Sequence, residues 1–140
     1  MDASAVLLAL LLALLLNPSV AFAAATLAPS SWDFGNRTVG TSSSKTFTYT
    51  NTHPNNAVNV TAVSVTGSGF SKGTESCTGT LAGGTSCNVS VNFTPPSRAS
   101  FSGTLTVTDD ANGSSSSGLT GHGISPGAAL APIPQTTGVG

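Results

Sequence analysis

Residues 86–94 read SCNVSVNFT, a strict alternation of polar and apolar side chains. Successive side chains of a β-strand point to opposite faces of a sheet, so Val89, Val91 and Phe93 would share one buried face. Cys87 falls in the same phase, and the polar residues between would face water. The stretch therefore predicts a strand that covers a hydrophobic core with one face and contacts solvent with the other.

Similar segments lie on both sides of this strand. In KTFTYTN (45–51), Phe47 and Tyr49 share one face and three threonines share the other. In residues 57–66 the apolar residues change phase near Ala62, which indicates a bulge or a strand break there. The other extended pieces are residues 27–34, 69–72, 101–109 and 115–124, and the last of these is the weakest.

No stretch after Ala25 shows apolar residues at helical spacing. About seven short strands separated by Gly, Asn, Ser and Pro point to two packed antiparallel sheets, because a single open sheet would leave one apolar face in water. The sequence therefore predicts an all-β chain, with one immunoglobulin-like sandwich over residues 26–124.

The composition limits what this domain can bind. The chain has 140 residues, of which 39% are hydrophobic and only 6% charged, with a formal net charge of -1. Arg37, Lys45, Lys72 and Arg98 are scattered along the chain. Nucleic acid is excluded as a partner, because binding it requires clustered Lys and Arg.

The N-terminal residues are typical of an export signal. Residues 3–16 (ASAVLLALLLALLL) are too short to span a bilayer, which takes roughly 20 residues, and Asn17-Pro18 ends the apolar run. Small residues follow at alternate positions, so we predict a signal peptide over residues 1–23, cleaved after Ala23, with Ala25 as the second choice. Met1-Asp2 lacks the usual basic residue, and the alternative is an uncleaved membrane anchor. The expected location is secreted, periplasmic or at the cell surface.

The C-terminal residues differ in composition from the rest. Residues 125–140, SPGAALAPIPQTTGVG, have neither periodicity nor charge. Their proline content argues against a membrane span, and we interpret them as a flexible tail or linker.

Cys77 and Cys87 flank TGTLAGGTS, a segment that can turn back on itself. In an exported chain an even cysteine number favours a disulfide. A metal site would need more ligands than His53 and His122, which are isolated in sequence, and the spacing is not the C-x-x-C of redox pairs. We expect a structural disulfide, worth about 3 kcal/mol.

No residues form a recognisable catalytic pattern. The sequence has no G-x-S-x-G; His53 lies in a polar turn, where we expect a solvated loop residue, and His122 lies between glycines, where we expect an edge strand. Asp109-Asp110 could suggest calcium, but a hairpin turn explains the pair better, since Asn112-Gly113 follows it. Trp32 is expected to pack in the core or at its edge, with partner binding as the alternative. We predict no catalytic site, metal or cofactor.

An ordered series of motifs resembles a known family, the Hydin-type (ASH-type) immunoglobulin-like domain, in the form found in bacterial "choice-of-anchor D" surface and secreted proteins. The series is Trp32-Asp33-Phe34-Gly35, Val39-Gly40, the Phe47/Tyr49 strand ending at Asn51, the segment from Gly69-Phe70 through Cys77, Leu81 and Gly84-Thr85-Ser86-Cys87 to Pro95, then Phe101–Val107 and Leu119–Gly123. The resemblance implies a seven-stranded sandwich related to major sperm protein and pilus-chaperone domains, and it brings no catalytic residues. Asn51-Thr52-His53-Pro54 departs from the family's usual Asn-x-Gly turn.

These observations predict a non-catalytic structural, adhesive or protein-interaction module of the cell envelope or extracellular space, with a protein or cell-surface partner. The alternative is a carbohydrate-binding or accessory module of a secreted enzyme system. Sugar platforms usually need several exposed aromatic rings, and the alternation turns most aromatic residues of this chain inward.

Overall fold

The computed structural model describes residues 24–127, so the expected signal peptide with its cleavage site at Ala23, and all but the start of the expected tail, lie outside the described residues. The described chain forms nine strands. They are β1 (Ala25–Ala28), β2 (Ser31–Thr38), β3 (Ser43–Asn51), β4 (Val58–Thr66), β5 (Phe70–Glu75), β6 (Gly79–Leu81), β7 (Ser86–Phe93), β8 (Ser100–Asp109) and β9 (Gly113–Ile124). Within this range no helix is long and apolar enough to cross a membrane.

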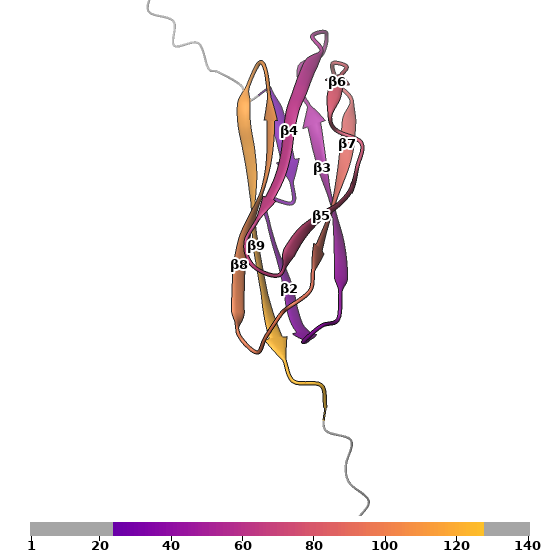
Figure 1. Ribbon diagram of the computed structural model, residues 1–140. Coiled ribbons are helices and arrows are strands. Elements are labelled where there is room, and N and C mark those ends of the chain that lie inside the picture. Colours follow the sequence, from indigo (N-terminus) through magenta and orange to yellow (C-terminus); the bar gives the residue numbers. More distant parts are fainter. Residues whose placement is uncertain (1–23, 128–140) are drawn as a thin grey trace, which may run out of the picture.

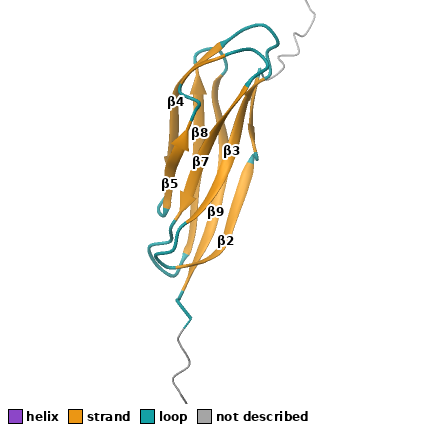
Figure 2. Ribbon diagram, turned by 90° about the vertical axis from the view of Figure 1, so that its right-hand side faces the viewer, coloured by secondary structure: helices purple, strands orange, loops and turns teal. Residues whose placement is uncertain are grey.

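The strands form two sheets packed face to face (Figures 1 and 2). One sheet has the order β1-β3-β7-β5 and the other the order β2-β9-β8-β4-β6. The predicted all-β, immunoglobulin-like sandwich is therefore confirmed. The described chain begins at one end of the sandwich and leaves β9 at the opposite end (Figure 1).

Two details of the predicted sandwich were wrong. The expected first piece is two strands, because the chain crosses from one sheet to the other at Pro29, which has no N–H to donate to a ladder. As a result β1 pairs with β3, whereas β2 pairs with β9 in parallel, so the sheets are not wholly antiparallel. The cysteine loop also contains a short strand, β6.

The core follows the predicted alternation. Phe47, Tyr49 and Phe93 are fully buried, as are the inward valines of β7. Phe93 stacks on Phe70 with a distance of 4.7 Å between ring centroids. The predicted change of phase in β4 is present as a shift of its register against β8 between Val60 and Ala62. The inward side chains of both sheets thus form one hydrophobic cluster.

The segment with the weakest signal forms the longest strand. β9 pairs with both β2 and β8, yet three of its four buried positions carry small residues, Ser117, Gly121 and Gly123. A Cβ atom on Gly121 would lie 2.4 Å from the Phe93 ring. Phe93 of the facing sheet fills the space at Gly121, whereas Pro95 and Ser97 of the β7–β8 loop approach Gly123. The Ser117 hydroxyl donates to the Pro29 carbonyl oxygen at 2.8 Å. These neighbours leave little apolar alternation in the sequence of β9.

The substitution Gly121→Ala is expected to lower the free energy of unfolding by about 2 kcal/mol, because Phe93 cannot move without disturbing the aromatic cluster. Gly118→Ala on the same strand is the matched control, since its Cβ would meet only Ser31 at 3.9 Å. It should change stability by less than about 0.5 kcal/mol. Urea unfolding measures both, and equal effects would contradict the packing argument.

Candidate functional site

The outer face of the four-stranded sheet carries only neutral polar side chains along its two central strands. Three cross-strand side-chain hydrogen bonds join them: Ser44 to Ser90 at 2.8 Å, Thr48 to Asn88 at 3.0 Å and Thr50 to Ser86 at 2.7 Å. We call this surface the hydroxyl–amide face; its outward residues are Ser44, Thr46, Thr48 and Thr50 of β3 and Ser86, Asn88, Ser90 and Asn92 of β7.

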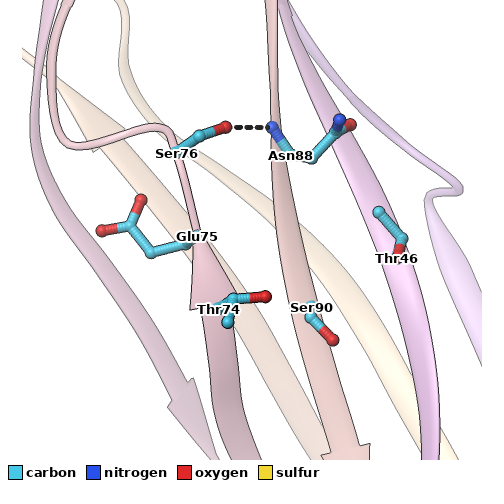
Figure 3. Close-up of a pocket in the computed structure, with 6 residues that line it drawn as sticks. All are labelled: Thr46, Thr74, Glu75, Ser76, Asn88 and Ser90. Carbon is cyan, nitrogen blue, oxygen red and sulfur yellow. Dashed lines mark hydrogen bonds between the residues drawn. The ribbon is translucent and has the colours of Figure 1, made fainter.

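A hollow of about 350 Å³ lies on this face where β5 loses its regular pairing with β7. The register shifts between Lys72 and Glu75. The backbone at Gly73 lies so close to Ser90 that a Cβ atom added at Gly73 would be 3.2 Å from the Ser90 side chain. Asn88 donates its backbone N–H to the Ser76 hydroxyl across the upper rim at 3.2 Å (Figure 3). The lining residues are Thr46, Thr74, Glu75, Ser76, Asn88 and Ser90.

Glu75 is the one charged residue of this lining, and its carboxylate is directed away from Ser90 in Figure 3. It accepts hydrogen bonds from the Cys77 N–H at 2.6 Å, the Thr78 N–H at 3.0 Å and the Thr78 hydroxyl at 2.6 Å. The hydrogen bond from the Thr78 hydroxyl is the main cause that lowers the pKa of the Glu75 carboxyl. The charge is used to hold the turn after β5, so the hollow offers hydroxyl and amide groups to a partner.

The disulfide joins Cys77, which follows β5, to Cys87 of β7. Both residues are buried in the hydrophobic cluster. The bond fixes the β5–β6 connection, and with it the Glu75 turn, against the strand that carries Asn88 and Ser90.

A buried carboxylate lies at the end of β8. Asp109 accepts hydrogen bonds from the hydroxyl of the fully buried Tyr49, from the Ala111 N–H at 2.8 Å, and from the N–H and side-chain amide of Asn112. Gly113 completes the turn with a φ of 81°. The structure thus shows the hairpin turn that the sequence favoured over calcium. Within residues 24–127 no group of three His, Cys, Asp or Glu side chains could hold a metal ion.

Burial alone would raise the pKa of the Asp109 carboxyl, but the hydrogen bonds from Tyr49, Asn112 and Ala111 outweigh it and hold this pKa below its usual range. A carboxyl whose folded pKa is depressed stabilises the fold above its unfolded pKa, about 3.9, and loses that contribution as the pH falls through the folded value. We therefore expect wild-type stability to decline below about pH 4. Asp109→Asn should decline less steeply in urea titrations at stepped pH, and identical slopes would contradict this role.

Three other residues singled out from the sequence lie apart from the hollow. The prediction that Trp32 packs in the core or at its edge was wrong, because its side chain is 38% exposed and lies outside the hydrophobic cluster, with the Lys45 ammonium 3.7 Å from its ring centroid. The prediction of an edge strand for His122 was wrong, because β9 lies between β2 and β8. The prediction of a solvated loop residue for His53 was also incomplete, because the side chain is half-buried. Its Nε2 lies 3.3 Å from the Asn56 side-chain amide, and its Nδ1 is buried without a hydrogen-bond partner in the described structure.

His122 shares a second hollow, of about 400 Å³, with Ser100 and Asp33 on the outer face of the other sheet. The His122 Nδ1 atom lies 3.1 Å from the Ser100 hydroxyl, directly across the ladder. A catalytic triad also requires a carboxylate that orients the imidazole. Asp33 instead accepts the Gly35 N–H at 2.9 Å, so the Ser100–His122 contact is a cross-strand hydrogen bond between exposed side chains.

Sequence reasoning missed the hydroxyl–amide face as a site and the capping role of Glu75. The first left a signal, since each outward position of residues 44–50 and 86–92 is Ser, Thr or Asn. The second could not be read from spacing, because it depends on the irregular pairing of β5.

Comparisons with known proteins agree with this architecture. The family model described as abnormal spindle-like microcephaly-associated, ASPM-SPD-2-Hydin (ASH), matches residues 19–117. Among solved structures, the ASH/PapD-like domain 7 of human CEP192 is 13% identical, with a TM-score of 0.58, and the match covers 74% of this chain and 87% of that one. A search of curated proteins gives no match.

Two Vibrio cholerae proteases contain a similar region. VesB is 26% identical with a TM-score of 0.55, and the match covers 71% of this chain and 32% of VesB. The secreted serine protease VesC is 23% identical with a TM-score of 0.54, over 65% of this chain and 21% of VesC. The chain therefore spans only a fifth to a third of the length of these proteases.

Proposed function

Because the chain belongs to the ASH (ASPM-SPD-2-Hydin) family, we propose that it is a non-catalytic protein-interaction module that works outside the cytoplasm, in the cell envelope or extracellular space. ASH domains generally mediate protein interactions, and this chain adds an apolar N-terminal segment of signal-peptide type over residues 1–23. The disulfide between Cys77 and Cys87 supports an oxidising location. The partner is a protein or another component of the cell surface.

We further propose that the protein is bacterial and related to the "choice-of-anchor D" surface and secreted proteins. The motifs from Trp32-Asp33-Phe34-Gly35 to Leu119–Gly123 support this relation. The 26% identity to VesB of Vibrio cholerae supports a bacterial setting.

The hydroxyl–amide face is the observation that carries the proposed protein-interaction role. Its hollow offers neutral groups from three strands, namely the hydroxyls of Thr46 and Thr74 and the side-chain amide of Asn88. Neutral hydrogen-bonding groups on a rigid sheet suit a partner with few charges, because no buried charge is left unpaired on contact. The face therefore fits a polar protein surface better than a strongly charged one.

Site-specific cross-linking tests this assignment. A photo-reactive residue placed at Thr74 in the native host should give a discrete cross-linked species, whereas the same residue at Thr120, an exposed threonine on the outer face of the opposite sheet, should not. Thr46→Lys should suppress the Thr74 product, because a charge in the hollow opposes docking. Equal products at both positions, or none at either, would count against the face as the contact surface.

An accessory or carbohydrate-binding role in a secreted enzyme system is the second candidate. It is favoured by the match to one third of VesB, which shows a similar region within a protease. A glycan array discriminates the two candidates, since specific binding that Thr46→Lys abolishes would favour a sugar ligand for the same hollow.

A further inference from the structure

The sandwich has two flanks on which the outermost strands of its sheets leave backbone groups without a strand partner. The strand orders place β4, β5 and β6 on one flank and β1, β2 and β3 on the other. An unpaired strand edge is a template for pairing with another chain, and natural sheets protect such edges with short strands, bulges and charged side chains. In this chain, where only 6% of residues are charged, the position of each charge is informative.

On the first flank, β6 covers only the beginning of β4. It pairs with Val58–Val60, whereas β8 pairs with β4 as far as Thr66. Peptide groups alternate in direction along a strand, so those of Val63 and Val65 face the side that β6 leaves open. This open edge of β4 has high β-propensity and no charge of its own.

Lys72 covers that edge from the facing sheet. Its side chain leaves β5 and donates from Nζ to the Val63 carbonyl oxygen at 3.3 Å. The ammonium thereby occupies an acceptor that an incoming strand would need, and it places a charge that an incoming apolar strand would have to desolvate. β5 itself is protected by the register shift that follows Lys72.

The second flank repeats this arrangement. β1 pairs with only part of β3, and the Lys45 ammonium rests over the Trp32 ring where β3 has no neighbour on that side. Arg37 donates from Nε, at 3.1 Å, to the carbonyl oxygen of Phe34, which lies in the irregular stretch of β2. Three of the four basic residues of the chain thus lie against strand edges.

We propose that Lys72 guards the open edge of β4, and that the partner it excludes is the same edge of a second copy of the chain. Two identical edges can pair antiparallel about a two-fold axis through Val63–Val65, which closes the contact in one step. A formal net charge of -1 gives two copies little mutual repulsion, so a local guard is needed in place of overall charge.

Sedimentation velocity of the purified protein over a range of concentrations tests this proposal. Lys72→Thr should shift the sedimentation coefficient from monomer toward dimer as concentration rises, and the amides of Val63 and Val65 should exchange more slowly in the associated form. Lys72→Arg, which keeps a long cation at the edge, should remain monomeric like the wild type.

Arg98→Thr is the matched control, because it removes the same charge from an exposed residue of the β7–β8 loop, outside the β4 edge. If Lys72→Thr does not fold, as judged by circular dichroism, Lys72→Met keeps the apolar stem and carries the same expectation. The proposal is overturned if Lys72→Thr sediments as the wild type does at every concentration, or if Arg98→Thr associates equally, which would make net charge the cause.

Discussion

Replacing Asp109 with alanine is expected to lower the free energy of unfolding by about 3 kcal/mol, because the change removes the carboxylate that accepts from the buried Tyr49 hydroxyl and from the β8–β9 turn. Burial and the contact with Asp109 raise the pKa of Tyr49, so its hydroxyl stays protonated and available as a donor. A buried donor that loses its acceptor bears a large cost of desolvation.

Two substitutions separate the parts of this effect. Tyr49→Phe removes one donor and leaves the turn contacts of Asp109 in place, so it should cost about 1 kcal/mol. Asp110→Ala, which loses one contact to the Asn59 N–H at the surface, should cost less than Asp109→Ala. Chemical unfolding with matched circular-dichroism and fluorescence probes measures all three, and equal losses for Asp109→Ala and Asp110→Ala would refute the buried network.

Removing the disulfide is the second change with a large expected effect. The double substitution of Cys77 and Cys87 by alanine should destabilise the fold by about 3 kcal/mol in the chain-entropy description, since it releases a short closed loop in the unfolded chain. Alanine leaves small buried side chains, so the loss includes some packing as well.

Reduction of the wild type provides the control for this change. A thiol reductant should lower the unfolding midpoint of the wild type toward that of the double variant and leave the double variant unchanged. A wild type that is as stable reduced as oxidised would show that the Cys77–Cys87 bond does not support the fold.

Strand positions were predictable where one face of a strand is buried and the other is wet. Alternation marked β3 and β7 because Phe47, Tyr49, Val89 and Val91 point into the core while hydroxyls point out. The phase change in β4 was predictable for the same reason, since the register shift moves the inward-facing residues from even-numbered positions (Val58, Val60) to the odd-numbered Val63.

Features that depend on the facing sheet could not be predicted. β9 looked weak because Phe93 fills the space above Gly121, and nothing local to β9 records that ring. The chain changes sheets at Pro29 because β1 pairs with β3, whereas β2 pairs in parallel with β9. Both pairings involve strands distant in sequence, so the residues around Pro29 do not reveal them. The hollow depends in the same way on irregular pairing between β5 and β7.

The proposed function depends above all on the proposal that the mature chain works outside the cytoplasm, which rests on the predicted signal peptide and on the disulfide, and which decides the choice of partner. The intact mass of the protein recovered from its native host tests this directly. The account predicts a chain that begins at Ala24 and is lighter by two hydrogens than its reduced form, which corresponds to the Cys77–Cys87 bond. A product that retains Met1 and carries two free thiols would contradict it.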